Sequence, residues 1–193
     1  MASRRTLAGL LSLALGARAA LVSNNGETAA IPNWDLISSS DTSSDLASLS
    51  KPGVDTSSWN HIEESKCTLM GCLISAGVYD VDELWFSDNL RRFNWGQFTV
   101  PWLYRNEFAL EAGDEGAHFI LQTHGISSRA DIFLNGEEVA TKDFQSGAYS
   151  GHEYEITELV TGDQNALVIR SYPTDYSKDL ALGFVDWNPY PPE

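Results

Sequence analysis

Three consecutive residues near the end of the sequence, Asp186, Trp187 and Asn188, combine a carboxylate, an indole ring and an amide. Proline cannot continue a helix or a central strand, so a loop is expected beside Pro189, Pro191 and Pro192. The indole offers a flat apolar surface, and its neighbours offer acceptors for a hydroxyl or an amine. The combination predicts a carbohydrate-binding loop.

Aromatic residues are also concentrated in LWFSDNLRRFNWGQFTVPWLY, residues 84–104, around Asp88, Asn89 and two arginines. Large aromatic side chains dominate protein cores and domain interfaces, and they also form platforms on which sugar rings stack. The sequence leaves both roles open for this segment.

Motifs for other chemistries are absent. GISSR and AYSGH lack the spacing of a nucleophile elbow, and no glycine-rich phosphate loop is present. His118 and His124 are expected on one face of one strand, too far apart to hold one metal ion, so no metal or other cofactor is predicted. Adjacent acids such as Glu137 and Glu138 point to opposite faces of a strand, so no catalytic carboxylate pair is predicted.

The balance of charge is acidic. The 193 residues include 12 lysines and arginines and 27 aspartates and glutamates, for a formal net charge of -15. Such a surface repels nucleic acid and anionic lipid, so neither nucleic acid nor a membrane is expected as a partner. A cationic polymer would be attracted at low salt, although charge alone is explained more simply by solubility.

Residues 1–19 have the pattern of a signal peptide: the basic MASRR, the apolar TLAGLLSLALG and a small-residue cleavage site at Ala17 to Ala19. A secreted protein is therefore predicted. An oxidising compartment would permit a disulfide between Cys67 and Cys72. A helix through both cysteines would hold their Cα atoms too far apart, so the bridge is left open.

The elements that must position these residues are mostly strands. An edge strand is expected around Ile31 to Ile37, a turn at residues 53–59 that delivers Trp59 toward a core, and a helical turn from Leu69 to Ala76 that ends at Gly77. Seven further apolar or alternating segments fit strands, at residues 97–104, 106–112, 117–125, 129–136, 137–144, 152–160 and 165–173.

Asn135-Gly136 predicts a hairpin between two of these strands, because both central residues of a type I′ turn need positive φ. Ala130, Ile132 and Leu134 then share one face of the first strand. Strands at this spacing, with little helix between them, indicate an all-β antiparallel sandwich.

In order along the chain, the sequence resembles the amino-terminal sugar-binding domain of the family 2 glycoside hydrolases, and most of all that of the secreted fungal exo-β-D-glucosaminidases, ahead of the β-mannosidases. The resemblance runs from Ile31 to Glu193 and is carried by GVDTSSW, CTLMGCLISAGVY, FNWGQFTVPWLYRNEFAL, HFILQTHGISSRADIFLNGEEVA and LALGFVDWNPYPPE. RADIFLNG is typical of the whole family, whereas LALGFVDWNPYPP is more specific to the glucosaminidases.

The resemblance implies a jelly-roll β-sandwich with a galactose-binding-like topology over residues 20–193, lacking its last strand. In such enzymes an immunoglobulin-like domain and a (β/α)8 barrel with both catalytic glutamates follow, so the implied partners are the barrel of the same polypeptide and chitosan or glucosamine oligomers. Asp186, Trp187 and Asn188 would help to form the pocket for the terminal sugar. The chain alone is expected to be a non-catalytic fragment, with a stand-alone secreted lectin-like module as the alternative.

Overall fold

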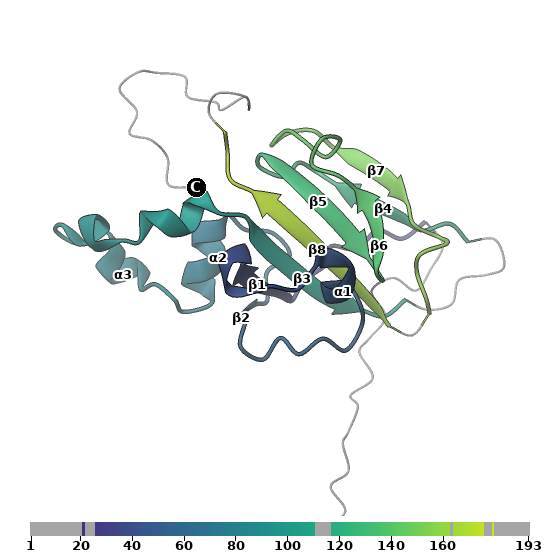
Figure 1. The fold of residues 1–193 in the computed structure, drawn as a ribbon, viewed down its shortest axis with the longest axis horizontal. Coiled ribbons are helices and arrows are strands. Elements are labelled where there is room, and N and C mark those ends of the chain that lie inside the picture. Colours follow the sequence, from purple (N-terminus) through teal and green to yellow (C-terminus); the bar gives the residue numbers. More distant parts are fainter. Residues whose placement is uncertain (1–20, 22–25, 111–116, 163, 176–178, 180–193) are drawn as a thin grey trace, which may run out of the picture.

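The computed structural model describes residues 21, 26–110, 117–162, 164–175 and 179 (Figure 1). Within them, strands form a six-stranded sheet in the order β2-β1-β3-β8-β5-β6 and a two-stranded sheet of β4 and β7. All pairings are antiparallel, as predicted for an all-β fold. The strands are β1 Trp34–Ser38, β2 Asn60–Ile62, β3 Trp102–Phe108, β4 Ile120–Thr123, β5 Arg129–Leu134, β6 Glu137–Ala140, β7 His152–Glu155 and β8 Asn165–Tyr172.

The helices are short. They are α1 Leu46–Leu49, α2 Leu69–Ser75 and α3 Val81–Leu84, with 3-10 turns η1 Ser39–Asp41, η2 Asn89–Arg92 and η3 Trp95–Thr99. The Thr68 side chain caps α2 by accepting a hydrogen bond from the Gly71 N–H, and Gly77 follows the helix with φ of 75°. The helix predicted from Leu69 and its glycine stop are confirmed.

The six-stranded sheet buries apolar side chains on both faces. On one face Leu36, Ile132, Leu134 and Leu167 pack in a cluster that includes Leu73 of α2 and residues around β4 and β7. On the other face Leu103 and Val168 pack under Leu46 and Leu49 of α1, beside the predicted inward-facing Trp59. Alternate residues of a strand point to opposite faces, so β3 and β8 each contribute to both clusters.

The hairpin predicted at Asn135-Gly136 is confirmed. It joins β5 to β6, with φ of 54° at Asn135 and 96° at Gly136. Ala130, Ile132 and Leu134 share a face and are all fully buried. The sequence pattern therefore predicted both the turn and the buried face of this strand, while the β5–β6 pairing contains a register shift between Ile132 and Phe133.

Two strand predictions were wrong. The expected edge strand is β1, but it lies between β3 and β2, and the short β2, which had not been predicted, forms the edge. The segments 97–104 and 106–112 contain one strand, β3, preceded by η3. The predicted break fell at Arg105, a charged residue that is nevertheless buried because Nε and Nη2 donate to the carbonyls of Leu49 and Lys51, both at 2.8 Å.

The placement of two histidines on one strand was also wrong. Strand β4 spans only Ile120–Thr123, so His118 and His124 lie beyond its two ends. His118 is exposed and contacts Glu155 at 3.5 Å. Among the described residues, no group of histidine, cysteine and acidic side chains is arranged to hold a metal ion. The same residues include no helix long and apolar enough to cross a membrane.

Candidate functional site

The predicted binding residues Asp186, Trp187 and Asn188 lie outside the described residues, as does the predicted signal peptide. The aromatic segment at residues 84–104 is described, and its members differ in burial. Trp102 is buried, whereas Trp85 and Phe86 are exposed to 61% and 73%. Trp102 lines a cavity, together with Phe98, Val100 and Tyr104 of the same segment.

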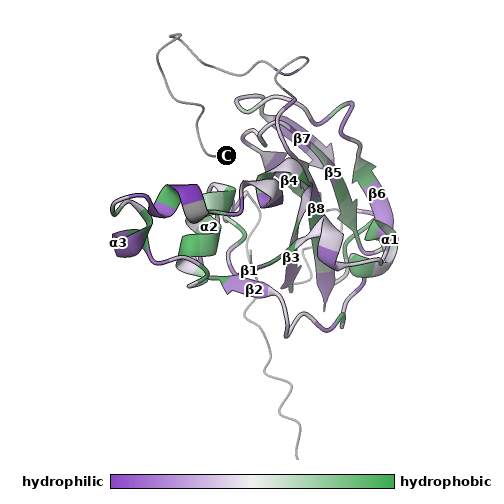
Figure 2. Ribbon diagram, turned by 60° about the vertical axis from the view of Figure 1, so that its left-hand side comes forward, coloured by the Kyte–Doolittle hydropathy of each residue, from purple (hydrophilic) through white to green (hydrophobic). Residues whose placement is uncertain are grey.

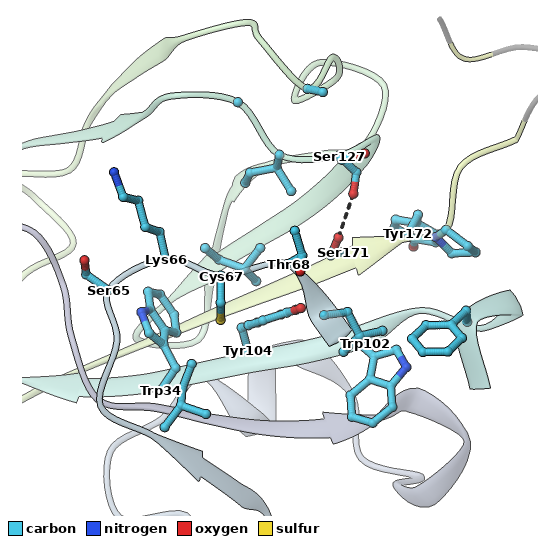
Figure 3. Close-up of a pocket in the computed structure, with 18 of the residues that line it drawn as sticks. Trp34, Ser65, Lys66, Cys67, Thr68, Trp102, Tyr104, Ser127, Ser171 and Tyr172 are labelled. Carbon is cyan, nitrogen blue, oxygen red and sulfur yellow. Dashed lines mark hydrogen bonds between the residues drawn. The ribbon is translucent and has the colours of Figure 1, made fainter. Parts of the chain in front are cut away.

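The cavity measures about 610 Å³ and lies on the face of the main sheet where β1, β3 and β8 meet the turn before α2 (Figure 3). Its aromatic floor consists of Trp34 from β1 and Trp102 and Tyr104 from β3. Further lining residues are Ile62, Ser65, Lys66, Cys67, Thr68, Leu69, Phe98, Val100, Gly125, Ile126, Ser127, Ala148, Ile169, Ser171, Tyr172 and Pro173.

The two indole rings of the floor are held by their own N–H groups. Nε1 of Trp34 donates to the carbonyl of Ile31 at 2.8 Å, and Nε1 of Trp102 donates to the carbonyl of Gln97 at 2.8 Å. The polar edge of each ring is thereby satisfied within the protein, which leaves apolar ring surface toward the cavity. Burial raises the pKa of Tyr104, so its hydroxyl stays protonated across the physiological range.

One rim of the cavity is held by a disulfide between Cys67 and Cys72, whose Cα atoms are 5.5 Å apart. A helix through both cysteines would have prevented this bridge, but α2 does not include Cys67. Helix α2 begins at Leu69, so Cys67 lies in the preceding extended turn and approaches Cys72 from outside the helix. The bridge links the segment carrying Ser65 and Lys66 to the buried Cys72 in the core.

The opposite rim has polar groups that are already paired. Ser171 Oγ donates to the carbonyl of Ser127 at 3.1 Å. The Tyr172 hydroxyl donates to Asp131 at 2.7 Å, and burial together with this hydrogen bond raises the pKa of Tyr172 to about 12. Nε and Nη2 of Arg170 donate to the same carboxylate oxygen at 3.1 and 2.6 Å. These contacts fix the side chains of this rim.

The described lining of the cavity is largely apolar and aromatic, which is the character of a binding surface. Among the described residues, no aspartate, glutamate or histidine lines it, and Lys66 is its one lysine or arginine. Glycoside hydrolysis needs two carboxyl groups flanking the bond. An apolar aromatic floor with hydroxyls at the rim suits the flat face of a sugar ring or an apolar side chain.

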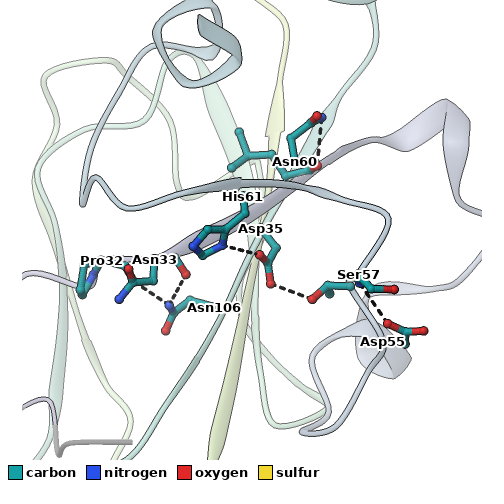
Figure 4. A network of polar contacts seen from close by, with 10 residues as sticks. Pro32, Asn33, Asp35, Asp55, Ser57, Asn60, His61 and Asn106 are labelled. Carbon is teal, nitrogen blue, oxygen red and sulfur yellow. Dashed lines mark hydrogen bonds and ion pairs between the residues drawn. The ribbon is translucent and has the colours of Figure 1, made fainter. Parts of the chain in front are cut away.

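A smaller, polar groove of about 400 Å³ lies on the other face of the sheet, beside the loop at residues 53–57. Its Asp35 carboxylate contacts Nδ1 of His61 at 2.9 Å and accepts from Thr56 Oγ1 at 2.8 Å (Figure 4). Glu107 accepts from the Gly53 N–H at 2.7 Å and pairs with Arg105. These carboxylates bind neighbouring protein groups, and the contacts tie the loop to the sheet.

Sequence reasoning missed most of the cavity. Trp102 and Tyr104 belong to the aromatic segment already noted, but Lys66, Ser127 and Ser171 carried no recognisable signal. They come from segments far apart in the chain that meet only once the sheet has formed. No local pattern marks such residues.

Comparison with known proteins agrees with this architecture. A family model described as the glycosyl hydrolase 2 galactose-binding domain-like family matches residues 36–189. The exo-β-D-glucosaminidase of Hypocrea jecorina is 60% identical over 181 residues, which is 94% of this chain and 20% of that protein. The exo-β-D-glucosaminidase of Arthroderma benhamiae is 51% identical over 90% of this chain and 20% of its own length.

Solved structures give the same fold. The exo-chitosanase CsxA of Amycolatopsis orientalis matches with a TM-score of 0.75 and 34% identity, over 84% of this chain and 18% of that chain. The β-D-mannosidase of Dictyoglomus thermophilum, at 19% identity and a TM-score of 0.51, shares the fold alone. The chain spans about one fifth of the length of the curated relatives it matches. It belongs to the galactose-binding-like domain family of the family 2 glycosyl hydrolases.

Proposed function

We propose that this chain is the non-catalytic, carbohydrate-binding domain of a secreted exo-β-D-glucosaminidase that removes terminal glucosamine from chitosan oligomers. The observation that carries the proposal is 60% identity to an exo-β-D-glucosaminidase over 94% of the chain. A β-mannosidase parent has less support, because the solved β-D-mannosidase is only 19% identical. Residues 1–19 would serve as the signal peptide for secretion.

In this proposal the catalytic glutamates belong to a barrel elsewhere in the polypeptide. The apolar and aromatic character of the described cavity lining supports a binding role for the present domain. Asp186, Trp187 and Asn188 would contribute to the pocket for the terminal sugar. The aromatic floor of the cavity would either receive a sugar ring or pack against another part of the enzyme.

Two measurements test the proposal. Sequencing the transcript through the Glu193 codon should reveal an open frame that encodes a barrel with two glutamates. The purified 193-residue chain, incubated with chitosan oligomers, should release no glucosamine. A stop directly after Glu193 in abundant message, or glucosamine release by the chain itself, would contradict the proposal.

A stand-alone lectin-like module is the second candidate, and the exposed rings of Trp85 and Phe86 favour it. It requires that the message end after Glu193 and that the isolated chain bind chitosan oligomers tightly in a calorimetric titration. Both results together would replace the first proposal with this one.

A further inference from the structure

Exposed apolar side chains gather on the arm that α3 begins. Trp85 is 61% exposed, Phe86 73% and Trp95 44%, and Val78 and Val81 beside them are also exposed. Helix α3 projects from the sandwich on the side away from β5 and β6 (Figures 1 and 2). We call Trp85, Phe86 and Trp95 the α3 platform. Exposed apolar groups gathered in this way mark an interaction surface more often than isolated ones do.

Trp95 of the platform belongs to a compact aromatic cluster. The Phe93 ring lies 4.3 Å from that of Tyr79, 5.3 Å from that of Trp95 and 5.6 Å from that of Phe98, measured between centroids. Nε1 of Trp95 donates to the carbonyl of Leu90 at 3.2 Å, so its polar edge is occupied within the arm. The exposed surface that remains on Trp95 is the apolar part of its ring.

Negative charge accompanies these rings. Residues 78–88 contain four acids and no basic residue, the acids being Asp80, Asp82, Glu83 and Asp88. The Asp80 side chain caps α3 by accepting from the Asp82 N–H at 2.9 Å. The nearest following basic residue with a described side chain, Arg91, lies in η2. The segment that carries the exposed Trp85 and Phe86 is therefore also acidic.

We propose that the α3 platform binds a chain of β-linked glucosamine residues, an inference that rests on the proposed function for its ligand class. The apolar faces of the sugar rings would stack on Trp85, Phe86 and Trp95. The ammonium groups would meet the carboxylates of Asp82 and Glu83 and the faces of the aromatic rings. The formal charge of -15 on the whole chain would attract the same polycation over a longer range.

The α3 platform and the cavity also differ in charge. Among the described residues, Lys66 is the charged residue that lines the cavity, and an ammonium group repels the ammonium of an amino sugar. The platform pairs aromatic rings with carboxylates, so it is the better match for a cationic sugar chain. The cavity suits an uncharged ring or an apolar side chain.

The first test is calorimetric titration of the full chain with a glucosamine hexamer at pH 5 and low salt, where the sugar amines are protonated. The variant Trp85→Ala/Phe86→Ala should bind roughly tenfold more weakly, because two stacking surfaces are removed. Tyr149→Ala, which removes a ring 82% exposed elsewhere on the molecule, should bind like the wild type.

The second test isolates charge. Asp82→Asn/Glu83→Gln should weaken binding several-fold and reduce its dependence on salt, whereas Glu137→Gln/Glu138→Gln on β6 should do neither. The fully N-acetylated hexamer, which carries no ammonium groups, should bind roughly tenfold more weakly than the glucosamine hexamer. Raising the pH until the amines lose their protons should weaken binding of the glucosamine hexamer in the same way.

Every contrary outcome overturns the platform. If the wild type does not bind, or if the Trp85→Ala/Phe86→Ala variant binds unchanged, the platform is not a sugar site. The proposed function is then still tested separately, by sequencing the transcript. Protection of Trp85 and Phe86 from hydroxyl-radical labelling in the longer enzyme without ligand would identify the platform as a contact between parts of the polypeptide. Circular dichroism of each variant confirms that lost binding is not lost folding.

Discussion

At the scale of single residues, Asp131 shows how one buried carboxylate organises a region of the sheet. It lies on β5 and accepts hydrogen bonds from Arg170, from the Tyr172 hydroxyl and, at 2.8 Å, from the Lys142 N–H. Burial alone would raise the pKa of Asp131, but the hydrogen bonds from Tyr172 and Arg170 outweigh it and hold the pKa below its usual value. The carboxylate therefore stabilises the fold in its charged form.

We predict that Asp131→Asn lowers the free energy of unfolding by about 2 kcal/mol at pH 7, because donors on Arg170 and Tyr172 lose a charged acceptor. Since the folded pKa lies below the unfolded value of about 3.9, this stabilisation is full above that value and is lost as pH falls through the folded pKa. Urea unfolding at pH 7, 5 and 3 should show the two proteins converging at the lowest pH.

The exposed Asp143→Asn is the matched control, and it should stay within about 0.5 kcal/mol of the wild type at pH 7. A constant difference between Asp131→Asn and the wild type from pH 7 to pH 3 would show that the charge on Asp131 does not carry the effect.

At the scale of elements, the β5–β6 hairpin depends on the side chain of Asn135 as well as on its backbone. Asn135 Nδ2 donates to the carbonyl of Leu159 at 2.7 Å and to Oδ1 of Asn165 at 2.8 Å, and its Oδ1 accepts from the Ala166 N–H at 2.9 Å. The turn residue therefore links the hairpin to β8 and to the loop before it.

Asn135→Ala is expected to lower the free energy of unfolding by about 3 kcal/mol. The alanine side chain makes none of these hydrogen bonds, and alanine is unfavourable at positive φ. Asn135→Gly, which keeps the backbone freedom, should cost about 1 kcal/mol less. Urea unfolding of both variants measures the two contributions, and equal losses would mean that the backbone conformation contributes nothing.

The Cys67–Cys72 bridge is the second element-scale feature. Cys67→Ser removes it while leaving the buried Cys72 in place, and the short closed loop predicts a loss of about 2 kcal/mol. Wild type unfolded under reducing conditions should show the same loss. Thiol labelling of the denatured, unreduced protein supplies the direct check: two reactive thiols would mean that the bridge does not form.

At the scale of the whole molecule, stability depends on covering both faces of the six-stranded sheet. Leu167 and Val168 are neighbours on β8, and both are buried, in the clusters on opposite faces. Leu167→Ala is expected to cost about 3 kcal/mol and Val168→Ala about 2 kcal/mol. Thermal and urea unfolding measure both.

The matched control is Ile120→Ala on β4, at a side chain that is 46% exposed, and it should cost less than about 1 kcal/mol. A neutral Val168→Ala would show that α1 and the 53–59 loop do not form a packed second layer. The same result would leave the burial of Arg105, which donates to the carbonyls of Leu49 and Lys51, unexplained.

Local sequence determined the elements whose signals are local. The Asn135-Gly136 turn, the shared face of Ala130, Ile132 and Leu134, and the helix stop at Gly77 each follow from backbone conformation or from the two-residue period of a strand. The antiparallel all-β class follows from their repetition along the chain. Motifs such as RADIFLNG and LALGFVDWNPYPP indicated membership of the family 2 glycoside hydrolases.

Tertiary structure decided what depends on partners distant in the chain. Arg105 reads as a break between strands, and only the carbonyls of Leu49 and Lys51 make its burial favourable within β3. The Cys67–Cys72 bridge depends on where α2 begins, and the cavity needs β1, β3, β8 and the turn at residues 65–68 in contact. The sequence shows that residues 84–104 are aromatic, but burial by the rest of the fold decides that Trp102 lines the cavity while Trp85 and Phe86 face solvent.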